Sequence, residues 1–213
     1  MTPRVVILSA PSGGGKTTIT QTLRERRADV GYSVSATTRP PRQGEQDGVA
    51  YHFVSRAEFE RLIAARELLE WAEYAGHLYG TLRREVRQVL SGGQHVLLDI
   101  EVQGARQVQR ECPPPASISV FVLPPDPETW IARLVGRETE APDALARRLE
   151  RAVTEIRESL DWEHIVINDD LDAVVSEVGI IIDEDGAVAH RPPIPRLLRL
   201  VEDLVSAAER RRP

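Results

Sequence analysis

Residues 5–18 read Val5-Val6-Ile7-Leu8-Ser9-Ala10-Pro11-Ser12-Gly13-Gly14-Gly15-Lys16-Thr17-Thr18, and this stretch decides the fold. Its apolar, β-branched start predicts a parallel strand that is buried on both faces. Three consecutive glycines follow, and they let backbone N–H groups converge on a phosphate with no Cβ in the way. A polar stretch to about residue 27 predicts a helix whose N-terminus faces the same phosphate.

Residues 10–15, which we call the phosphate loop, nearly complete the pattern G-x-x-x-x-G-K-[ST] together with Lys16 and Thr17. Lys16 would supply a cation to the β- and γ-phosphates, and the Thr17 hydroxyl suits a Mg²⁺ ion. One departure is Ala10, which stands where the first glycine is expected. A glycine-rich turn that binds nothing is the alternative, but the flanking strand and helix favour nucleotide binding.

The composition limits the class of protein. A chain of 213 residues can bury a sizeable core in one domain. Its formal net charge of −6 argues against general nucleic-acid binding, which depends on a basic surface. The single cysteine, Cys112, cannot form an internal disulfide. We find no zinc-ligand spacing, no membrane-length apolar run and no signal peptide, so we expect a soluble, cytoplasmic protein.

Apolar runs alternate with helical patterns along the rest of the chain. Strands are predicted over residues 32–36, 51–54, 95–100, 118–123 and 165–167, and helices over 82–90, 102–111, 127–134, 144–160, 171–181 and 196–210. This alternation predicts an α/β fold with a doubly wound, parallel, five-stranded sheet flanked by helices. For residues 171–182 a hairpin is the alternative, because Asp185-Gly186 is a turn signal. Residues 35–83 are richer in short strands and turns and predict an inserted lobe.

Three further groups of polar residues are candidate site residues. Arg39 and Arg42 share a loop of prolines and glycines. Paired arginines can bind phosphate oxygens from two sides. The alternative is that both arginines are simply solvated. Asp99 ends an apolar strand, where a carboxylate can hold Mg²⁺ or its waters, or can simply be a surface residue. Glu70 lies among apolar residues and could equally be the solvated face of an edge strand.

Arginines also gather in and before the helix predicted over residues 144–160. A lid that brings arginines onto transferring phosphates would explain them. A charged helical surface with glutamate partners such as Glu150 and Glu155 is the alternative. The arginines are Arg133, Arg137, Arg147, Arg148 and Arg151.

With these residues assembled, the chain resembles the guanylate kinase family, whose members use ATP to phosphorylate GMP. The resemblance covers roughly residues 4–185, and in this family Ala-Pro-Ser-Gly is a known form of the loop, which accounts for Ala10. The motifs that carry the resemblance are residues 9–17, 33–45 and 51–54, together with Glu70-Trp71-Ala72, Tyr79-Gly80-Thr81, Leu98-Asp99-Ile100, Val102-Gln103-Gly104-Ala105 and Asn168-Asp169-Asp170. Two departures are Glu138, where the lid commonly has glycine, and Glu101, where aspartate is frequent.

The resemblance implies a role for individual residues. ATP would be bound by Ala10, Pro11, Ser12, Gly13, Gly14, Gly15, Lys16, Thr17, Thr18, Arg133, Arg137 and Asn168, with Asn168 at the adenine. Arg39, Arg42, Tyr51 and Tyr79 would hold the GMP phosphate, Ser35, Glu70 and Thr81 would read guanine, and Asp99 would lie near Mg²⁺ and the GMP base. Lys16, Arg39, Arg137 and Arg148 would be catalytic, with no general base. Mg²⁺ would be the cofactor, held by Thr17 and through water by Asp99.

Guanine itself supports the role of Glu70. It presents adjacent N1–H and N2–H₂ donors that one carboxylate can accept together, whereas adenine has no such pair. The expected organisation is one domain with a core (1–34, 84–124, 164–190), a GMP-binding lobe (35–83), a lid (125–163) and a C-terminal linker and helix (191–213).

The expected reaction forms ADP and GDP from ATP and GMP, and the expected assembly is a monomer or homodimer that binds neither nucleic acid nor membrane. A non-catalytic guanylate-kinase-like binding module is one alternative, against which the intact Lys16 and Thr17 argue. A related kinase for another small phosphorylated acceptor is the other, against which Glu70 argues.

Overall fold

The computed structural model describes residues 2–74, 76–135 and 142–210. Its larger sheet has five parallel strands in the order β2-β7-β1-β8-β9. The strands are β1 (Val5–Ser9), β2 (Val30–Tyr32), β7 (His95–Asp99), β8 (Ser117–Leu123) and β9 (His164–Ile167). All five residues of β1 are buried, which fits the apolar run Val5-Val6-Ile7-Leu8 that precedes Ser9 in this strand. The predicted α/β fold with a five-stranded parallel sheet is confirmed.

A smaller, four-stranded sheet has the order β4-β3-β6-β5. It consists of β3 (Ala36–Thr37), β4 (His52–Phe53), β5 (Leu68–Tyr74) and β6 (His77–Leu82), with β5 antiparallel to β6. Helix α2 (Arg56–Ala64) packs Phe59 and Leu62 against apolar residues of these strands. Ser55 caps the start of this helix, because its hydroxyl accepts a 3.1 Å hydrogen bond from the Glu58 N–H.

The single strand predicted over residues 32–36 is wrong. The segment contributes to two strands, since β2 pairs with β7 in the larger sheet and β3 pairs with β4 and β6 in the smaller one. Residues 33–35 connect them without strand pairing. Alternating side chains indicate which face of a strand is buried, and they carry no information about which neighbour supplies the hydrogen bonds.

Residue contacts divide the chain into two units, which are described separately. The first comprises the residues up to Ile7 and residues 24–118, and it contains the smaller sheet with α2, α3 (Arg83–Ser91) and α4 (Val102–Glu111). In this unit α3 packs against β2, β6 and β7, and α4 packs against β5. The lobe and lid boundaries expected at 35–83 and 125–163 stay predictions.

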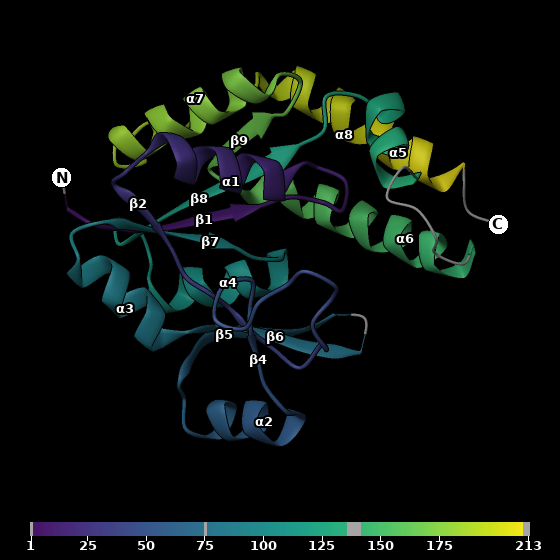
Figure 1. Ribbon diagram of the computed structural model, residues 1–213. Coiled ribbons are helices and arrows are strands. Elements are labelled where there is room, and N and C mark those ends of the chain that lie inside the picture. The colour runs from purple at the N-terminus through teal and green to yellow at the C-terminus, as the bar shows by residue number, and fades with distance from the viewer. Residues whose placement is uncertain (1, 75, 136–141, 211–213) are drawn as a thin grey trace. The chain divides into compact units, whose positions relative to one another are not determined.

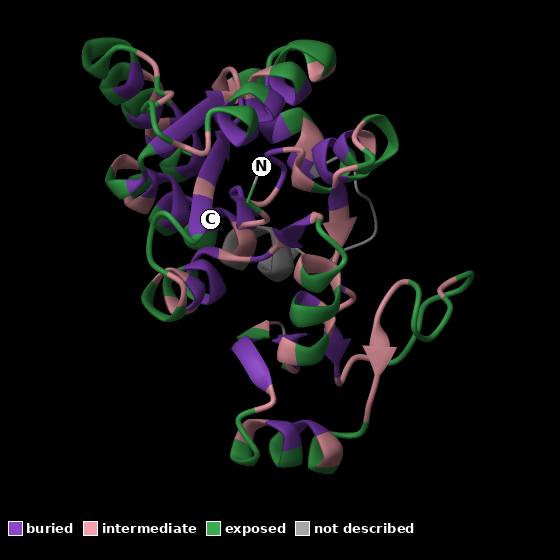
Figure 2. Cartoon of the chain, turned by 90° about the vertical axis from the view of Figure 1, so that its left-hand side faces the viewer, coloured by how far each residue is buried: buried purple, intermediate pink, exposed green. Residues whose placement is uncertain are grey.

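The second unit comprises residues 8–23 and 119–213. Helix α1 (Lys16–Arg26) begins in it, directly after the phosphate loop. The other helices are α5 (Pro127–Val135), α6 (Pro142–Glu158), α7 (Leu171–Asp183) and α8 (Ile194–Glu209). Helix α7 lies along β9, and α8 packs against α5 and α6 (Figure 1). Buried residues follow the strands and the inner faces of the helices, while exposed residues cover the outer turns (Figure 2).

The C-terminal half of this unit agrees with the helical prediction. Helix α7 runs through the ambiguous segment to Asp183, and the hairpin alternative is wrong. Asp185 and Gly186 instead turn the chain away from the helix, with φ of 57° and 66°. Helix α8 buries Leu197, Val201 and Leu204. Within the described ranges, no helix combines the length and apolar character that membrane crossing requires.

Candidate active site

The phosphate loop leaves β1 at Ser9 and enters α1 at Lys16. Gly13 and Gly15 have φ of 82° and 94°, a left-handed backbone that glycine adopts without strain. The Gly14 N–H donates a 2.8 Å hydrogen bond to the Pro11 carbonyl. A Cβ on Gly14 would lie 2.9 Å from the Cβ of Ala10, so Gly14 leaves the space that the methyl group of Ala10 fills. The departure at Ala10 is thus accommodated inside the loop.

Two helices of the same unit hold the loop at Ser12. The Trp130 indole of α5 donates a 2.8 Å hydrogen bond from Nε1 to the Ser12 carbonyl. The Arg148 guanidinium of α6 donates from Nε and Nη2 to the Ser12 hydroxyl, at 3.3 and 3.1 Å. Arg148 therefore contacts the phosphate loop, and its catalytic role stays a prediction. The sequence predicts a helix over residues 127–134, which includes Trp130, and no local signal links this residue to the loop.

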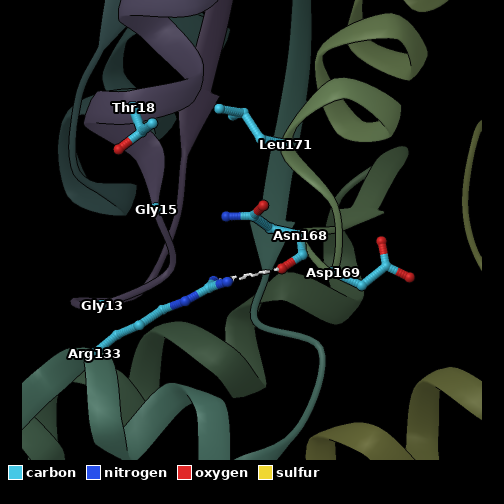
Figure 3. A pocket seen from close by; sticks show the side chains of 7 residues that line it. All are labelled: Gly13, Gly15, Thr18, Arg133, Asn168, Asp169 and Leu171. Atoms are coloured by element: carbon cyan, nitrogen blue, oxygen red, sulfur yellow. Dashed lines mark hydrogen bonds between the residues drawn. The ribbon is translucent and has the colours of Figure 1, made fainter.

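A pocket of about 400 Å³ opens beside the loop. Asn168 forms its buried wall and donates a 2.9 Å hydrogen bond from Nδ2 to the Gly14 carbonyl. Both terminal nitrogens of Arg133 lie 3.4 Å from the backbone carbonyl oxygen of Asn168 (Figure 3). The lining residues are Gly13, Gly15, Thr18, Arg133, Asn168, Asp169 and Leu171. Five of these seven are residues for which the sequence predicts ATP binding, whereas Asp169 and Leu171 are not among the predicted residues.

In the first unit, Glu70 and Thr81 form a second polar site. They are register partners on β5 and β6, so their side chains lie on the same face of the smaller sheet. The Thr81 hydroxyl donates a 2.7 Å hydrogen bond to Glu70 Oε1. Glu70 is only 5% exposed, and the alternative of a solvated edge-strand carboxylate is wrong. A buried carboxylate is stable only with hydrogen-bond partners, and the Thr81 hydroxyl is one of them.

Arg39 lies among aromatic rings and a carboxylate in the same unit. Its guanidinium carbon is 5.4 Å from the centre of the Tyr51 ring, and the Tyr51 and Tyr79 rings meet edge-on at 5.9 Å. Its Nη2 donates a 2.8 Å hydrogen bond to Glu45. This pairing raises the pKa of Arg39 and lowers the pKa of Glu45. Glu45 also accepts a 2.7 Å hydrogen bond from the Arg42 backbone N–H, so it holds both arginines of the loop.

The remaining predicted site residues differ in how far they are exposed. Arg42 and Thr17 are exposed, Lys16 and Ser35 are half-buried, and Asp99 is the partly buried last residue of β7. The Ser35 carbonyl accepts a 2.9 Å hydrogen bond from the His52 N–H. Arg137 and Glu138 lie outside the described residues. The ligand roles of all these residues stay predictions.

Comparison with known proteins identifies the family. A family model described as guanylate kinase matches residues 2–185. A guanylate kinase of Thermobifida fusca is 48% identical over 179 residues, which span 84% of this chain and 90% of the relative. A guanylate kinase of Symbiobacterium thermophilum is 47% identical over 178 residues, with 84% and 83% covered. The crystal structure of guanylate kinase from Anaplasma phagocytophilum matches with a TM-score of 0.71 at 28% identity, covering 93% of this chain and 94% of that one. The chain therefore belongs to the guanylate kinase family.

Proposed function

We propose that this protein transfers the γ-phosphoryl group of ATP to GMP, and to dGMP as well, giving ADP and the nucleoside diphosphate. The observation that carries the proposal is the buried Glu70 carboxylate, bonded at 2.7 Å to Thr81 in a chain that also has a phosphate loop with Lys16 and Thr17 in place. A kinase needs the loop for its donor, and a guanine acceptor accounts for the carboxylate.

The donor side binds by charge and backbone geometry. The loop N–H groups and the N-terminus of α1 stabilise phosphate oxygens, and Lys16 adds a positive charge. Arg148 is bonded to Ser12 of the same loop, so its guanidinium is close to where phosphate oxygens would bind. The GMP phosphate is already ionised at neutral pH, so transfer requires positioning and charge neutralisation and no general base.

On the acceptor side, different residues would bind the guanine base and the phosphate of GMP. Glu70 would accept guanine N1–H and N2–H₂, and a pair of such hydrogen bonds contributes about 1–3 kcal/mol of discrimination. Arg39, Tyr51 and Tyr79 lie together and offer a fixed guanidinium and two hydroxyls to a phosphate dianion. In this structure the Arg39 guanidinium is hydrogen-bonded to Glu45. A bound phosphate would therefore have to compete with Glu45 for Arg39 or bind to Arg39 together with Glu45.

Magnesium suits the donor site. Among the described residues no group of three or more acidic, histidine or cysteine side chains could hold a metal ion. Mg²⁺ bound to a nucleotide keeps several waters and needs only one or two protein oxygens in addition to phosphates. The exposed Thr17 hydroxyl beside the loop meets that need, and Asp99 would act through water. The ion would neutralise charge on the β- and γ-phosphates.

The expected setting follows from composition. The single cysteine fits a reducing cytoplasm, and the net charge of −6 does not suit a nucleic-acid partner. We propose a cytoplasmic protein that acts as a monomer or homodimer on small nucleotides.

A coupled assay of ADP formation with Mg²⁺ and ATP tests the function across GMP, dGMP, AMP, CMP and UMP. We expect turnover with the two guanine nucleotides only. Equal turnover of AMP would remove the base-reading role of Glu70 and favour a kinase for another acceptor. ATP binding with no ADP formed on any acceptor would favour a non-catalytic binding module.

A further inference from the structure

Helix α4 approaches one oxygen of the Glu70 carboxylate, while Thr81 bonds the other. Glu70 Oε1 is bonded to Thr81, while Oε2 lies over Gly104 in the first turn of α4. A Cβ on Gly104 would lie 2.3 Å from Oε2 and 3.0 Å from the carboxylate carbon. The carboxylate therefore occupies the volume that any other residue at position 104 would need.

The same helix also holds the backbone next to Glu70. The Gln107 side chain accepts a 3.3 Å hydrogen bond from the Trp71 N–H and donates a 2.7 Å hydrogen bond to the Trp71 carbonyl. Strand β5 is the last strand of its sheet, so these two backbone groups have no neighbouring strand on that side. The Gln107 amide takes the place of that missing strand and fixes β5 to α4 at the residue that follows Glu70.

We propose that Gly104 and Gln107 are positioning residues that set the guanine-reading geometry of Glu70, an inference that rests on the proposed function. A carboxylate can accept two adjacent base donors only when both oxygens are in line with them, because hydrogen bonds weaken steeply with misalignment. Thr81 fixes one oxygen, Gly104 leaves room for the other, and Gln107 fixes the strand. Specificity for a 6-oxo-2-amino purine thus depends on a helix that need not touch the base.

The clash at Gly104 predicts a functional effect with little effect on folding. The atom that an added methyl group meets is the end of a flexible side chain, which can move, and alanine is a better helix residue than glycine. Gly104→Ala should therefore leave the fold intact and displace the carboxylate. The GMP KM should rise by at least about five-fold, the size expected for losing a bidentate base contact. The ATP KM should stay within about two-fold, since the phosphate loop is unchanged.

Inosine monophosphate separates positioning from general damage, because it lacks the 2-amino group. If Glu70 is displaced, the preference for GMP over inosine monophosphate should fall in parallel with GMP affinity. Gly92→Ala, at the residue that caps the end of α3, is the glycine control. Its φ of −75° suits alanine, and the added methyl group would lie 3.3 Å from the Val89 carbonyl oxygen, a much longer contact than the one at Gly104. Gln107→Ala should act in the same direction as Gly104→Ala, and Gln88→Ala, at an exposed position of α3, is its control.

A double-mutant cycle with Glu70→Ala decides whether Gly104 acts through Glu70. With no carboxylate to displace, Gly104→Ala should not weaken GMP binding, measured by calorimetry, beyond Glu70→Ala alone. A further loss in the double variant would overturn the inference, and so would an unfolded Gly104→Ala protein or an unchanged GMP KM in an active one. Wild-type protein that does not phosphorylate GMP would instead remove the proposed function.

Discussion

The Asn168 side-chain amide donates a 2.9 Å hydrogen bond to the carbonyl oxygen of Gly14, joining the segment after β9 to the phosphate loop. The Asn168 amide also lies close to the next residue, Gly15, since a Cβ on Gly15 would lie 2.2 Å from Asn168 Nδ2. The predicted role of Asn168 was contact with the adenine of ATP. What the structure shows is a contact with the backbone of the phosphate loop.

Asn168→Asp should weaken ATP binding more than GMP binding. The substitution replaces the donor Nδ2 by a carboxylate oxygen, which repels the Gly14 carbonyl and leaves it unpaired in a buried place. We expect the ATP KM to rise by about 5- to 150-fold, matching the usual cost of an unsatisfied buried group of about 1–3 kcal/mol. Initial rates at varied ATP and GMP measure it. An equal rise in both KM values would contradict a local effect on the loop.

Arg39→Lys should raise the GMP KM by at least about ten-fold while keeping the net charge. Lysine cannot fork around a phosphate or lie flat over the Tyr51 ring, which Arg39 faces at 5.4 Å. Steady-state kinetics on GMP and ATP provide the measurement. Arg56→Lys on α2 is the matched control, because Arg56 is exposed and pairs only along its own helix with Glu60 among the contacts described. Unchanged GMP kinetics in Arg39→Lys would exclude Arg39 from the phosphate site.

Sequence patterns predicted most of the fold and part of the site, and the failures have physical causes. Strand β1, the phosphate loop and helix α1 are local in sequence, so their order and chemistry could be read directly. Glu70 could not be assigned as buried, because its partners Thr81 and Gly104 come from other elements. The contact of Trp130 with the phosphate loop could not be predicted for the same reason, since Trp130 bonds to Ser12, which lies 118 residues before it. Contacts between distant segments leave no local pattern.

The unfolding free energy should fall in mildly acidic solution because of His164. This histidine is 1% exposed, and burial lowers its pKa in the folded protein below the ordinary value of 6.5. Glu163 opposes the shift and His190 reinforces it. As the pH falls below 6.5, the unfolded chain takes up the proton first, so stability is lost until the pH passes the folded pKa.

His164→Gln should remove this part of the pH dependence. Urea unfolding of both proteins between about pH 5 and 8 would give the comparison, and the difference between the two curves isolates His164. The difference is needed because burial raises the pKa of Glu177, and a raised carboxyl pKa contributes the opposite slope at lower pH. Parallel curves for the two proteins would show that His164 titrates alike in the folded and unfolded states.

Helix α8 should be an integral part of the second unit, although it lies beyond the residues that the family model matches. Leu204 is 0% exposed in this helix, and Leu204→Ala should lower the unfolding free energy by about 2–5 kcal/mol. Leu198→Ala, at a position 44% exposed on the same helix, should cost much less. Chemical denaturation distinguishes them. Equal, small effects would mean that α8 contributes little to the fold.

The hydrogen bond from Trp130 to Ser12 gives the phosphate loop an optical reporter. Indole emission responds to nearby charge and hydrogen bonding, and Trp130 is 0% exposed, so solvent quenching contributes little. Of the other two tryptophans in the chain, Trp162 is 4% and Trp71 39% exposed. Replacing those two by phenylalanine would leave an intrinsic fluorophore bonded to the loop itself. Nucleotide occupancy of this loop then becomes readable in real time, without a label and without turnover.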